Sequence, residues 1–193
     1  MNKINYYKKL LLKIKNNSAT IAIVGLGYVG SELIKKFDKK GFKTIGIDTD
    51  KNKLKLKKNK NMILTNNYKF INKSDIIIIA LPTPLTKNLK PDLSYIKKSL
   101  INLKKYMKKG QLLSLESTTY PGTTEEILAK YIQKNNFKLS NDYFLVYSPE
   151  RISPELKVKN QTIKFKLHNT PKVCGGYSNK CKKLGLAIYK KYK

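Results

Sequence analysis

Three glycines near the beginning of the sequence have the spacing of a loop that binds phosphate groups. Gly25, Gly27 and Gly30 form the pattern G-x-G-x-x-G between a β-branched run at residues 20–24 and a segment with helical periodicity at residues 31–37. In such a loop the first glycine permits a tight turn, the second lets the backbone approach a pyrophosphate, and the third brings the helix close to the strand. The N-terminus of the helix then points at the anion. The pattern and its context predict a dinucleotide-binding site.

A carboxylate follows where a ribose ligand is expected. Asp48 ends the next predicted strand, residues 42–47, and lies 18 positions after Gly30, near the roughly 20 typical of such sites. A 2′-phosphate about 4 Å from this carboxylate would be repelled by about 4 kcal/mol per charge pair, so Asp48 favours NAD over NADP. Lys53 and the neighbouring lysines could neutralise a 2′-phosphate and weaken that preference. Asp50 is the alternative ribose ligand, although it falls beyond the strand end.

The rest of the chain alternates between apolar runs and helical periodicities. Residues 75–81 are predicted as a third strand with almost no polar interruption, which is typical of a sheet covered on both faces. Further strands are predicted at residues 112–115, 144–147 and 172–174, and further helices at residues 51–58, 93–107, 121–133 and 180–190. Strands that alternate with helices predict an α/β protein with a Rossmann-like doubly wound parallel sheet and helices on both faces.

Two parts of the sequence are expected to differ from this regular pattern. Residues 1–17 are predicted as a basic helical extension, and residues 18–193 as one NAD-binding domain. Residues 152–169 are expected to be irregular, and His168 within them is expected to be a solvated loop residue.

The sequence is strongly basic, with 41 Lys+Arg against 12 Asp+Glu and a formal net charge of +29. Such a charge favours nonspecific contact with polyanions. The lysines are spread along the whole chain, however, and Arg151 is its only arginine, although arginine is preferred for bidentate phosphate and guanine contacts. Drift towards A/T-rich codons accounts for this composition, so we do not expect a specific nucleic-acid partner.

Several other classes are excluded or disfavoured. The longest strongly apolar stretch, residues 76–81, is far shorter than the roughly 20 residues of a membrane-spanning helix. Residues 1–17 interrupt a short leucine run with lysines and offer no small-residue cleavage site, which argues against a signal peptide and predicts a cytoplasmic protein. Cys174 and Cys181 lack the spacing of a metal site.

Five motifs occur in a specific order along the chain: GLGYVG at residues 25–30, PTPL at 82–85, PDLSY at 91–95, ESTTYPGTTEE at 116–126 and SPER at 148–151. With them the chain resembles the UDP-glucose/GDP-mannose dehydrogenase family over about residues 18–190. The last two motifs resemble its UDP-N-acetylhexosamine 6-dehydrogenase branch. The resemblance implies two NAD molecules used in succession to oxidise the C6 alcohol of a nucleotide sugar to a carboxylate, through an aldehyde and a cysteine thioester.

The resemblance also implies cofactor contacts, which agree with those inferred from the residues themselves. Asp48 holds the ribose, and Lys53 lies near the adenosine end. Pro82 and Thr83, after the third predicted strand, lie beside the cofactor, although a proline-flanked turn with a purely structural role is the alternative. The residues expected to line the pyrophosphate are Gly25, Gly27, Tyr28, Val29 and Gly30.

Two further positions match catalytic residues of the family. Ser117 and Thr118 follow the fourth predicted strand, and the resemblance places Thr118 near the nicotinamide, where it helps to order a catalytic water. The residues from Thr118 to Thr124 could also simply cap the next helix, and both roles can hold together. Glu150 matches the carboxylate that acts as general base in thioester hydrolysis, and a carboxylate activates water best when partial burial raises its pKa. An ordinary ion pair with Arg151 is the alternative.

The sequence departs from the family pattern at the nucleophile. The family's cysteine belongs to a later glycine-rich segment that precedes a nucleotide-sugar domain, and neither is in these residues. Cys174 is expected to be a small buried thiol, and Cys181 lies on a lysine-rich predicted helix. We therefore expect a truncated chain or one member of a split pair, unable to turn over a UDP-N-acetylhexosamine without a separately encoded C-terminal partner. A non-catalytic dinucleotide-binding or interaction module and a basic nucleic-acid-binding protein are the alternatives.

Overall fold

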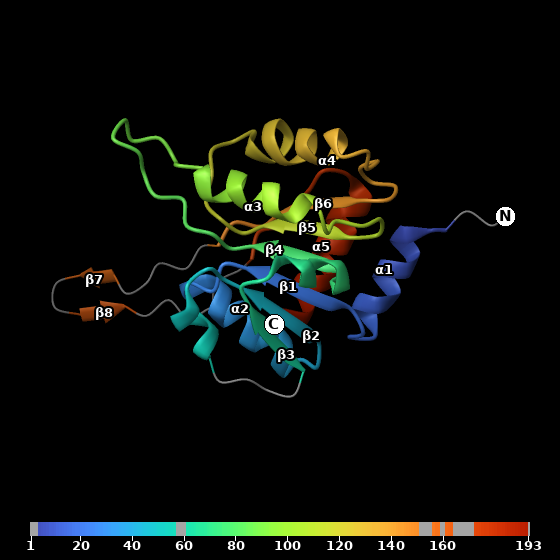
Figure 1. The fold of residues 1–193 in the computed structure, drawn as a ribbon, viewed down its shortest axis with the longest axis horizontal. Coiled ribbons are helices and arrows are strands. Elements are labelled where there is room, and N and C mark those ends of the chain that lie inside the picture. Colours follow the sequence, from blue (N-terminus) through green and yellow to red (C-terminus); the bar gives the residue numbers. More distant parts are fainter. Residues whose placement is uncertain (1–3, 57–60, 151–155, 159–160, 164–171, 193) are drawn as a thin grey trace.

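Short apolar strands that pair in parallel form the centre of the molecule (Figure 1). The computed structural model describes residues 4–56, 61–150, 156–158, 161–163 and 172–192. The main sheet has the order β3-β2-β1-β4-β5-β6-β9, and all its neighbouring strands are parallel except β6 and β9. Its strands are β1 (Thr20–Val24), β2 (Lys43–Ile47), β3 (Met62–Thr65), β4 (Ile76–Ile79), β5 (Leu112–Leu115), β6 (Phe144–Tyr147) and β9 (Gly175–Gly176).

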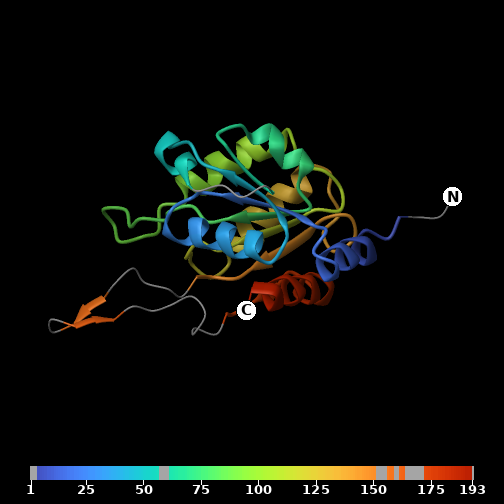
Figure 2. The same cartoon turned by 90° about the horizontal axis from the view of Figure 1, so that it is seen from below.

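Helices cover both faces of this sheet (Figure 2). One face packs against α1 (Tyr6–Lys15), α2 (Tyr28–Lys39) and α5 (Asn179–Tyr192), and the other against α3 (Ser94–Lys104), η3 (Thr124–Ala129) and α4 (Lys130–Lys134). Because successive side chains of a strand point to opposite faces, Ile76 and Ile78 of β4 join the first core and Ile77 and Ile79 join the second. The predicted fold class, a doubly wound and mostly parallel sheet, is confirmed.

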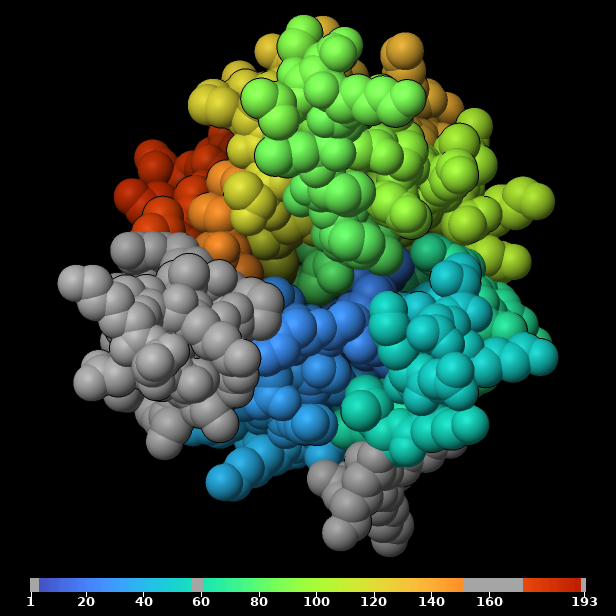
Figure 3. All heavy atoms as spheres, turned by 90° about the vertical axis from the view of Figure 1, so that its left-hand side faces the viewer, coloured from blue at the N-terminus to red at the C-terminus, as the bar shows by residue number. Residues whose placement is uncertain are grey.

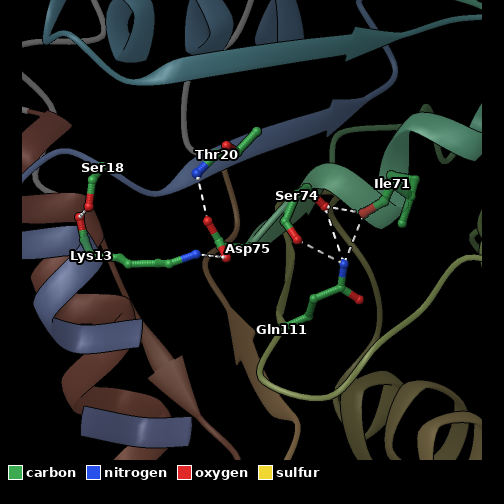
Figure 4. A network of polar contacts seen from close by, with 7 residues as sticks. All are labelled: Lys13, Ser18, Thr20, Ile71, Ser74, Asp75 and Gln111. Carbon is green, nitrogen blue, oxygen red and sulfur yellow. Dashed lines mark hydrogen bonds and ion pairs between the residues drawn. The ribbon is translucent and has the colours of Figure 1, made fainter. Parts of the chain in front are cut away.

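The N-terminal helix α1 is attached to the end of the sheet where β1 and β4 begin (Figure 4). Lys13 Nζ lies 2.6 Å from Oδ1 of Asp75, whose Oδ2 accepts a 2.9 Å hydrogen bond from the main-chain N–H of Thr20. Leu10 and Ile14 of α1 are buried in the same core as α2 and α5. The predicted helix within residues 1–17 therefore exists and shares the core of the sheet, while the predicted boundary at residue 18 stays a prediction.

A buried side-chain amide, that of Gln111, joins two segments at the same end of the sheet. The side-chain nitrogen of Gln111 donates to the carbonyl oxygens of Ile71 and Ser74 at 2.9 and 3.0 Å (Figure 4). This amide joins the loop before β5 to the 3₁₀ helix η2 (Tyr68–Lys73), which precedes β4. Gln111 is fully buried, so its hydrogen bonds offset the cost of removing the amide from water.

One strand of the sheet was not predicted. β3 lies at an edge and is four residues long, with Met62 and Leu64 buried and Ile63 exposed. Its apolar run, residues 62–64, has only three residues, which is shorter than the runs of about four to eight that indicate a buried strand. The strand within residues 75–81, predicted as the third, is consequently the fourth in chain order.

The predicted strand at residues 172–174 is wrong in position. The chain instead pairs at Gly175–Gly176, antiparallel to the end of β6. The Ser148 hydroxyl donates a 2.7 Å hydrogen bond to the carbonyl oxygen of Val173. A Cβ on Gly176 would lie 2.2 Å from the nitrogen of Lys182, so this strand can pass beside α5 only as glycine.

The stretch at residues 152–169, expected to be irregular, contains a two-stranded antiparallel ladder between β7 (Leu156–Val158) and β8 (Gln161–Ile163). Arg151 and His168 lie outside the described residues. The helix predicted at residues 51–58 is a 3₁₀ helix, η1 (Lys51–Lys55), capped by Asp50, whose Oδ1 accepts from the N–H of Asn52. Residues 57 and 58 lie outside the described part.

No helix in the described residues is long and apolar enough to cross a membrane. The same residues contain no cluster of three or more His, Cys, Asp or Glu that could hold a metal ion.

Candidate cofactor-binding site

The predicted site residues come together because five parallel strands end in register. Val24 pairs with Ile47 and with Ile79, Ile79 pairs with Leu115, and Leu115 pairs with Tyr147. The residues that follow these strand ends are Gly25, Asp48, Ala80, Glu116 and Ser148. In an open parallel sheet the crevice outside these carboxyl ends is where ligands bind.

Figure 3 looks onto this edge of the molecule. The blue segment after β1 lies between the cyan segment after β2 and the green loop after β4. The segments are far apart in the sequence, and the sheet order β2-β1-β4 places their strands side by side. β1 is therefore the point from which the chain turns to both sides of the sheet, as a topological switch point requires.

The glycine turn has the backbone geometry that its pattern predicts. Gly25 has a φ of +93°, and a Cβ there would lie 2.6 Å from the carbonyl oxygen of Ala80. A Cβ on Gly30 would lie 1.8 Å from the carbonyl oxygen of Gly25, so the turn and the helix can approach this closely only without side chains. Gly27 differs, because a Cβ there would meet nothing within 4 Å.

The open space at Gly27 lies at the N-terminus of α2. Gly27 is the N-cap of this helix and provides no side chain to accept the first N–H groups. Helices usually satisfy these donors with a Ser, Thr, Asp or Asn cap. An N-terminus without a side-chain cap, reached through open space, can take an anionic group. Tyr28 in the first turn is 51% exposed, and Val29 is partly buried against the core.

Asp48 is bound to the glycine turn. Its Oδ2 accepts a 2.7 Å hydrogen bond from the N–H of Leu26 and lies 3.7 Å from Lys53 Nζ, while Oδ1 accepts from the N–H of Asp50 at 2.9 Å. These contacts fix the carboxylate beside the turn. Each of its oxygens can accept more than one hydrogen bond, so both can also accept from hydroxyl groups. The side chain of Asp50, by contrast, caps η1 and accepts from the N–H of Asn52.

Two side-chain hydroxyls, one from a threonine and one from a serine, join the loops after β4 and β5. Thr83 Oγ1 donates to the carbonyl oxygen of Thr118 at 2.7 Å, and Ser117 Oγ donates to that of Leu81 at 2.6 Å. Ser117 is buried, whereas Thr118 and Pro82 are exposed. The structure thus brings Thr83, Ser117 and Thr118 into one unit. This unit lies next to the glycine turn, since a Cβ on Gly25 would be 3.0 Å from Cδ2 of Leu81.

Glu150 belongs to a second, buried group of polar residues. Its Oε2 lies 2.9 Å from Lys172 Nζ, and Lys172 also pairs with Glu116, the first residue after β5. The hydroxyl of Tyr189 in α5 donates to Oε1 of Glu116, and Ser114 Oγ lies 2.7 Å from the Tyr189 oxygen. Sequence reasoning assigned no role to Glu116, Lys172 or Tyr189, although Glu116 ends an apolar strand as Asp48 does.

Burial raises the pKa values of Glu116, Tyr189 and Cys174. The side chain of Glu116 is fully buried, and this desolvation raises its pKa to about 7, against the opposing effects of Lys172 and Tyr189. The pKa of Tyr189 is raised well above its usual value by its own burial and by the Glu116 carboxylate. The pKa of Cys174 is raised to about 11, mainly by burial and then by Glu116.

Neither cysteine has the environment of an activated nucleophile. Cys181 is fully buried, and its sulfur accepts from the N–H of Leu145 at 3.4 Å. Cys174, expected to be the buried thiol, is only partly buried, because it lies in the extended segment before β9 and not within a strand. Its raised pKa keeps it in the thiol form at neutral pH, and the thiolate is the nucleophilic form.

Comparisons with known proteins identify relatives of this arrangement. The family model described as UDP-glucose/GDP-mannose dehydrogenase family, NAD binding domain, matches residues 53–193. Protein CapL of Staphylococcus aureus is 39% identical over 154 residues, which are 72% of this chain and 36% of that protein. The UDP-N-acetyl-D-glucosamine 6-dehydrogenase of Pseudomonas aeruginosa is 33% identical over 151 residues, 69% of this chain and 36% of the relative.

A solved structure shares the fold. The NDP-N-acetyl-D-galactosaminuronic acid dehydrogenase of Methanosarcina mazei Go1 superposes with a TM-score of 0.78 at 23% identity, over 98% of this chain and 45% of that one. This chain therefore spans less than half of the length of the relatives it matches.

Proposed function

Because this chain belongs to the UDP-glucose/GDP-mannose dehydrogenase family and carries its NAD-binding domain, we propose that the edge where β1, β2, β4 and β5 end binds NAD for the oxidation of a nucleotide sugar. The observation that supports this site most directly is the 2.7 Å hydrogen bond from Leu26 N–H to Asp48 Oδ2. It joins the turn that would hold the pyrophosphate to the carboxylate that would hold the ribose.

The residues present fit an adenine dinucleotide. The space beside Gly27 admits a group that a side chain would displace, and the N-terminus of α2 favours its negative charge. Tyr28, Val29 and Gly30 form the first turn of that helix. Asp48 accepts the ribose hydroxyls, and Lys53, 3.7 Å away, lies at the adenosine end. NAD supplies the chemistry of hydride acceptance when it is bound.

The loops after β4 and β5 are assigned to the nicotinamide end. Pro82, Thr83 and Ser117 would contact the cofactor, and the exposed Thr118 would orient a water near the reacting carbon. Glu150, whose side chain is 10% exposed, would accept a proton from water during hydrolysis of the enzyme-bound acyl group. These assignments follow the family motifs and the proximity of the two loops.

The substrate class that we propose is a UDP-N-acetylhexosamine, oxidised at C6 to the uronic acid. It is supported by the motifs of residues 116–126 and 148–151 and by the name of the Pseudomonas relative, a UDP-N-acetyl-D-glucosamine 6-dehydrogenase. We assign the nucleophile to neither Cys174 nor Cys181. Turnover is therefore expected only when another polypeptide segment supplies a thiol, and the 193 residues alone are expected to bind NAD without oxidising the sugar.

A pair of alanine variants tests the cofactor site. Wild-type protein is titrated with NADH, and nicotinamide fluorescence reports binding. Gly27→Ala fills the open space and has a φ of −67° that alanine adopts freely, so it should fold normally and bind NADH at least tenfold more weakly. Gly175→Ala, whose Cβ meets only the Tyr147 carbonyl oxygen at 3.8 Å, is the matched control. Equal NADH affinity in wild type and Gly27→Ala would contradict the proposal.

A second measurement separates an enzyme from a binding module. A separately expressed C-terminal half of a family member, carrying the cysteine, is mixed with this chain and a UDP-N-acetylhexosamine. Formation of NADH at 340 nm supports the dehydrogenase role. NADH binding without turnover in every such mixture would favour a module that only binds the dinucleotide.

A further inference from the structure

The ammonium group of Lys172 lies between two carboxylates at the carboxyl ends of β5 and β6. Its Nζ is 2.9 Å from Oε2 of Glu150 and contacts Oε2 of Glu116. The side chains of Lys172 and Glu150 are each 10% exposed, and that of Glu116 is not exposed at all. The three charges are thus largely removed from water and interact with one another more strongly than surface charges do.

The inner end of this group is anchored in the protein interior. Glu116 accepts the hydroxyl hydrogen of Tyr189, and Ser114 then donates to the Tyr189 oxygen at 2.7 Å. Lys172 Nζ also lies 5.1 Å from the centre of the Tyr189 ring, within the range of a cation–π interaction. Glu116 therefore has a fixed position, and Lys172 reaches from it towards Glu150.

We propose that Lys172 is a positioning residue that holds the Glu150 carboxylate in place and ionised, and that the buried Glu116 sets how strongly Lys172 does so. This role rests on the proposed task of Glu150 as the base that activates water. An ionised Glu116 neutralises Lys172 and leaves Glu150 a better proton acceptor, whereas a protonated Glu116 lets the full charge of Lys172 act on Glu150.

The charges around the group allow this control. Glu116 faces Lys172, Tyr189 and Glu150, and its pKa of about 7 lets it change charge near neutral pH. Glu150 faces Lys172 and interacts electrostatically with Lys36 of α2. The partly buried Cys174 lies near Glu116 and Lys172 but is protonated at neutral pH. Loss of Lys172 must then raise the pH at which Glu150 takes up its proton, and the ionisation of Glu116 near pH 7 must change the environment of the Glu150 carboxylate.

The experiment follows the carboxyl carbon of Glu150 by NMR in the full 193-residue chain. The sequence contains only six glutamates, so protein labelled with ¹³C at the glutamate carboxyl carbon gives six resonances, and Glu150→Gln identifies the one from Glu150. The pH at which this resonance changes is measured in wild type, Lys172→Met, Lys172→Arg and Glu116→Gln. Lys98→Met removes an exposed lysine from α3 and is the matched control.

We expect the midpoint for Glu150 to rise by about one to three pH units in Lys172→Met, the size of effect that a close opposite charge has. It should stay near the wild-type value in Lys172→Arg, Lys98→Met and Glu116→Gln, because Glu116, with its pKa of about 7, is already protonated at the lower pH at which a carboxylate kept ionised by Lys172 takes up its proton. In wild type the Glu150 resonance should also shift near pH 7, as Glu116 ionises, and this second shift should be absent from Glu116→Gln. If Lys172→Met does not fold, a Glu150 shift near pH 7 that is present in wild type and Lys172→Arg and absent from Glu116→Gln still supports the proposal.

An unchanged midpoint in folded Lys172→Met, or a shift of the Glu150 resonance near pH 7 that persists in Glu116→Gln, would overturn the proposal. NADH affinity is measured on the same samples. Failure of wild type to bind NADH would count against the proposed cofactor site. The titration of Glu150 tests the role of Lys172 whether or not NADH binds.

Discussion

The N–H of Leu26 donates a 2.7 Å hydrogen bond to Oδ2 of Asp48, so the turn after β1 and the carboxylate after β2 form one structural unit. Asp48 thus has a structural contact on the oxygen that also lies 3.7 Å from Lys53. A change at Asp48 should therefore affect both the turn and the choice of cofactor.

Asp48→Asn is expected to weaken NADH binding by about ten- to a hundredfold, because a hydrogen bond to a charged group contributes about 1.5–3 kcal/mol. The loss for NADPH should be smaller, because the variant no longer repels a 2′-phosphate while Lys53 remains. Fluorescence titrations with both dinucleotides measure the ratio. Asp50→Asn, at the exposed cap of η1, is the control, and an equal loss there would instead identify Asp50 as the ribose ligand.

Gly30→Ala is expected to destabilise the fold, in contrast to Gly27→Ala. A Cβ at residue 30 would lie 1.8 Å from the Gly25 carbonyl oxygen, and main chain at that distance must move. Overpacking of this kind costs about 1–3 kcal/mol. Urea unfolding of the two variants measures the difference, and equal midpoints for both would show that the turn is more adaptable than its contacts indicate.

Glu116→Gln is expected to change the pH dependence of stability. Because burial raises the pKa of Glu116 from 4.5 to about 7, the folded protein binds this proton more tightly than the unfolded chain does. The contribution of Glu116 to the free energy of unfolding therefore falls as pH rises from about 4.5 to about 7. The stability of Glu116→Gln relative to wild type should increase over that interval.

Urea unfolding at pH 5 and pH 7.5 tests this expectation. Glu125→Gln, at an exposed glutamate in the first turn of η3, is the control for loss of one carboxylate. A stability difference between Glu116→Gln and wild type that is the same at both pH values would contradict it.

Asp75→Ala is expected to destabilise the protein without altering NADH affinity. The carboxylate accepts from Thr20 N–H at 2.9 Å and pairs with Lys13 at 2.6 Å, and loss of bonds to a charged group costs about 1.5–3 kcal/mol. These contacts lie where β1 and β4 begin, at the opposite end from the proposed cofactor site. Thermal unfolding and NADH titration are measured together, with Asp75→Asn as the variant that keeps an acceptor.

The sequence patterns predicted those parts of the site that are local in the chain. The turn at Gly25 and the carboxylate at Asp48 each follow an apolar strand, so a short segment contains the whole signal. The doubly wound sheet follows for the same reason, since each strand and helix is indicated by its own periodicity. β3 was missed because only its first three residues are apolar, and a run that short does not indicate a strand.

The polar group around Glu116 could not be predicted in the same way. Lys172 lies 56 residues from Glu116, and Tyr189 lies 73 residues from it. In the sequence, Lys172 is one of many lysines, and nothing local distinguishes it from those on the surface. Only the packing of α5 and of the segment before β9 against β5 and β6 brings the three side chains together. Ion pairs of this kind depend on tertiary structure and leave no periodic pattern.

The in-register ends of β1, β2, β4, β5 and β6 limit which length changes the gene can tolerate. Deleting one residue inside β2 would move Asp48 about 3.3 Å away from Leu26. It would also turn Ile45 and Ile47 away from their core. The same deletion beyond the paired residues, for example in the exposed loop at residues 86–90, would leave every strand end where it is. Insertions and deletions among natural variants should therefore gather in such loops and avoid the strands.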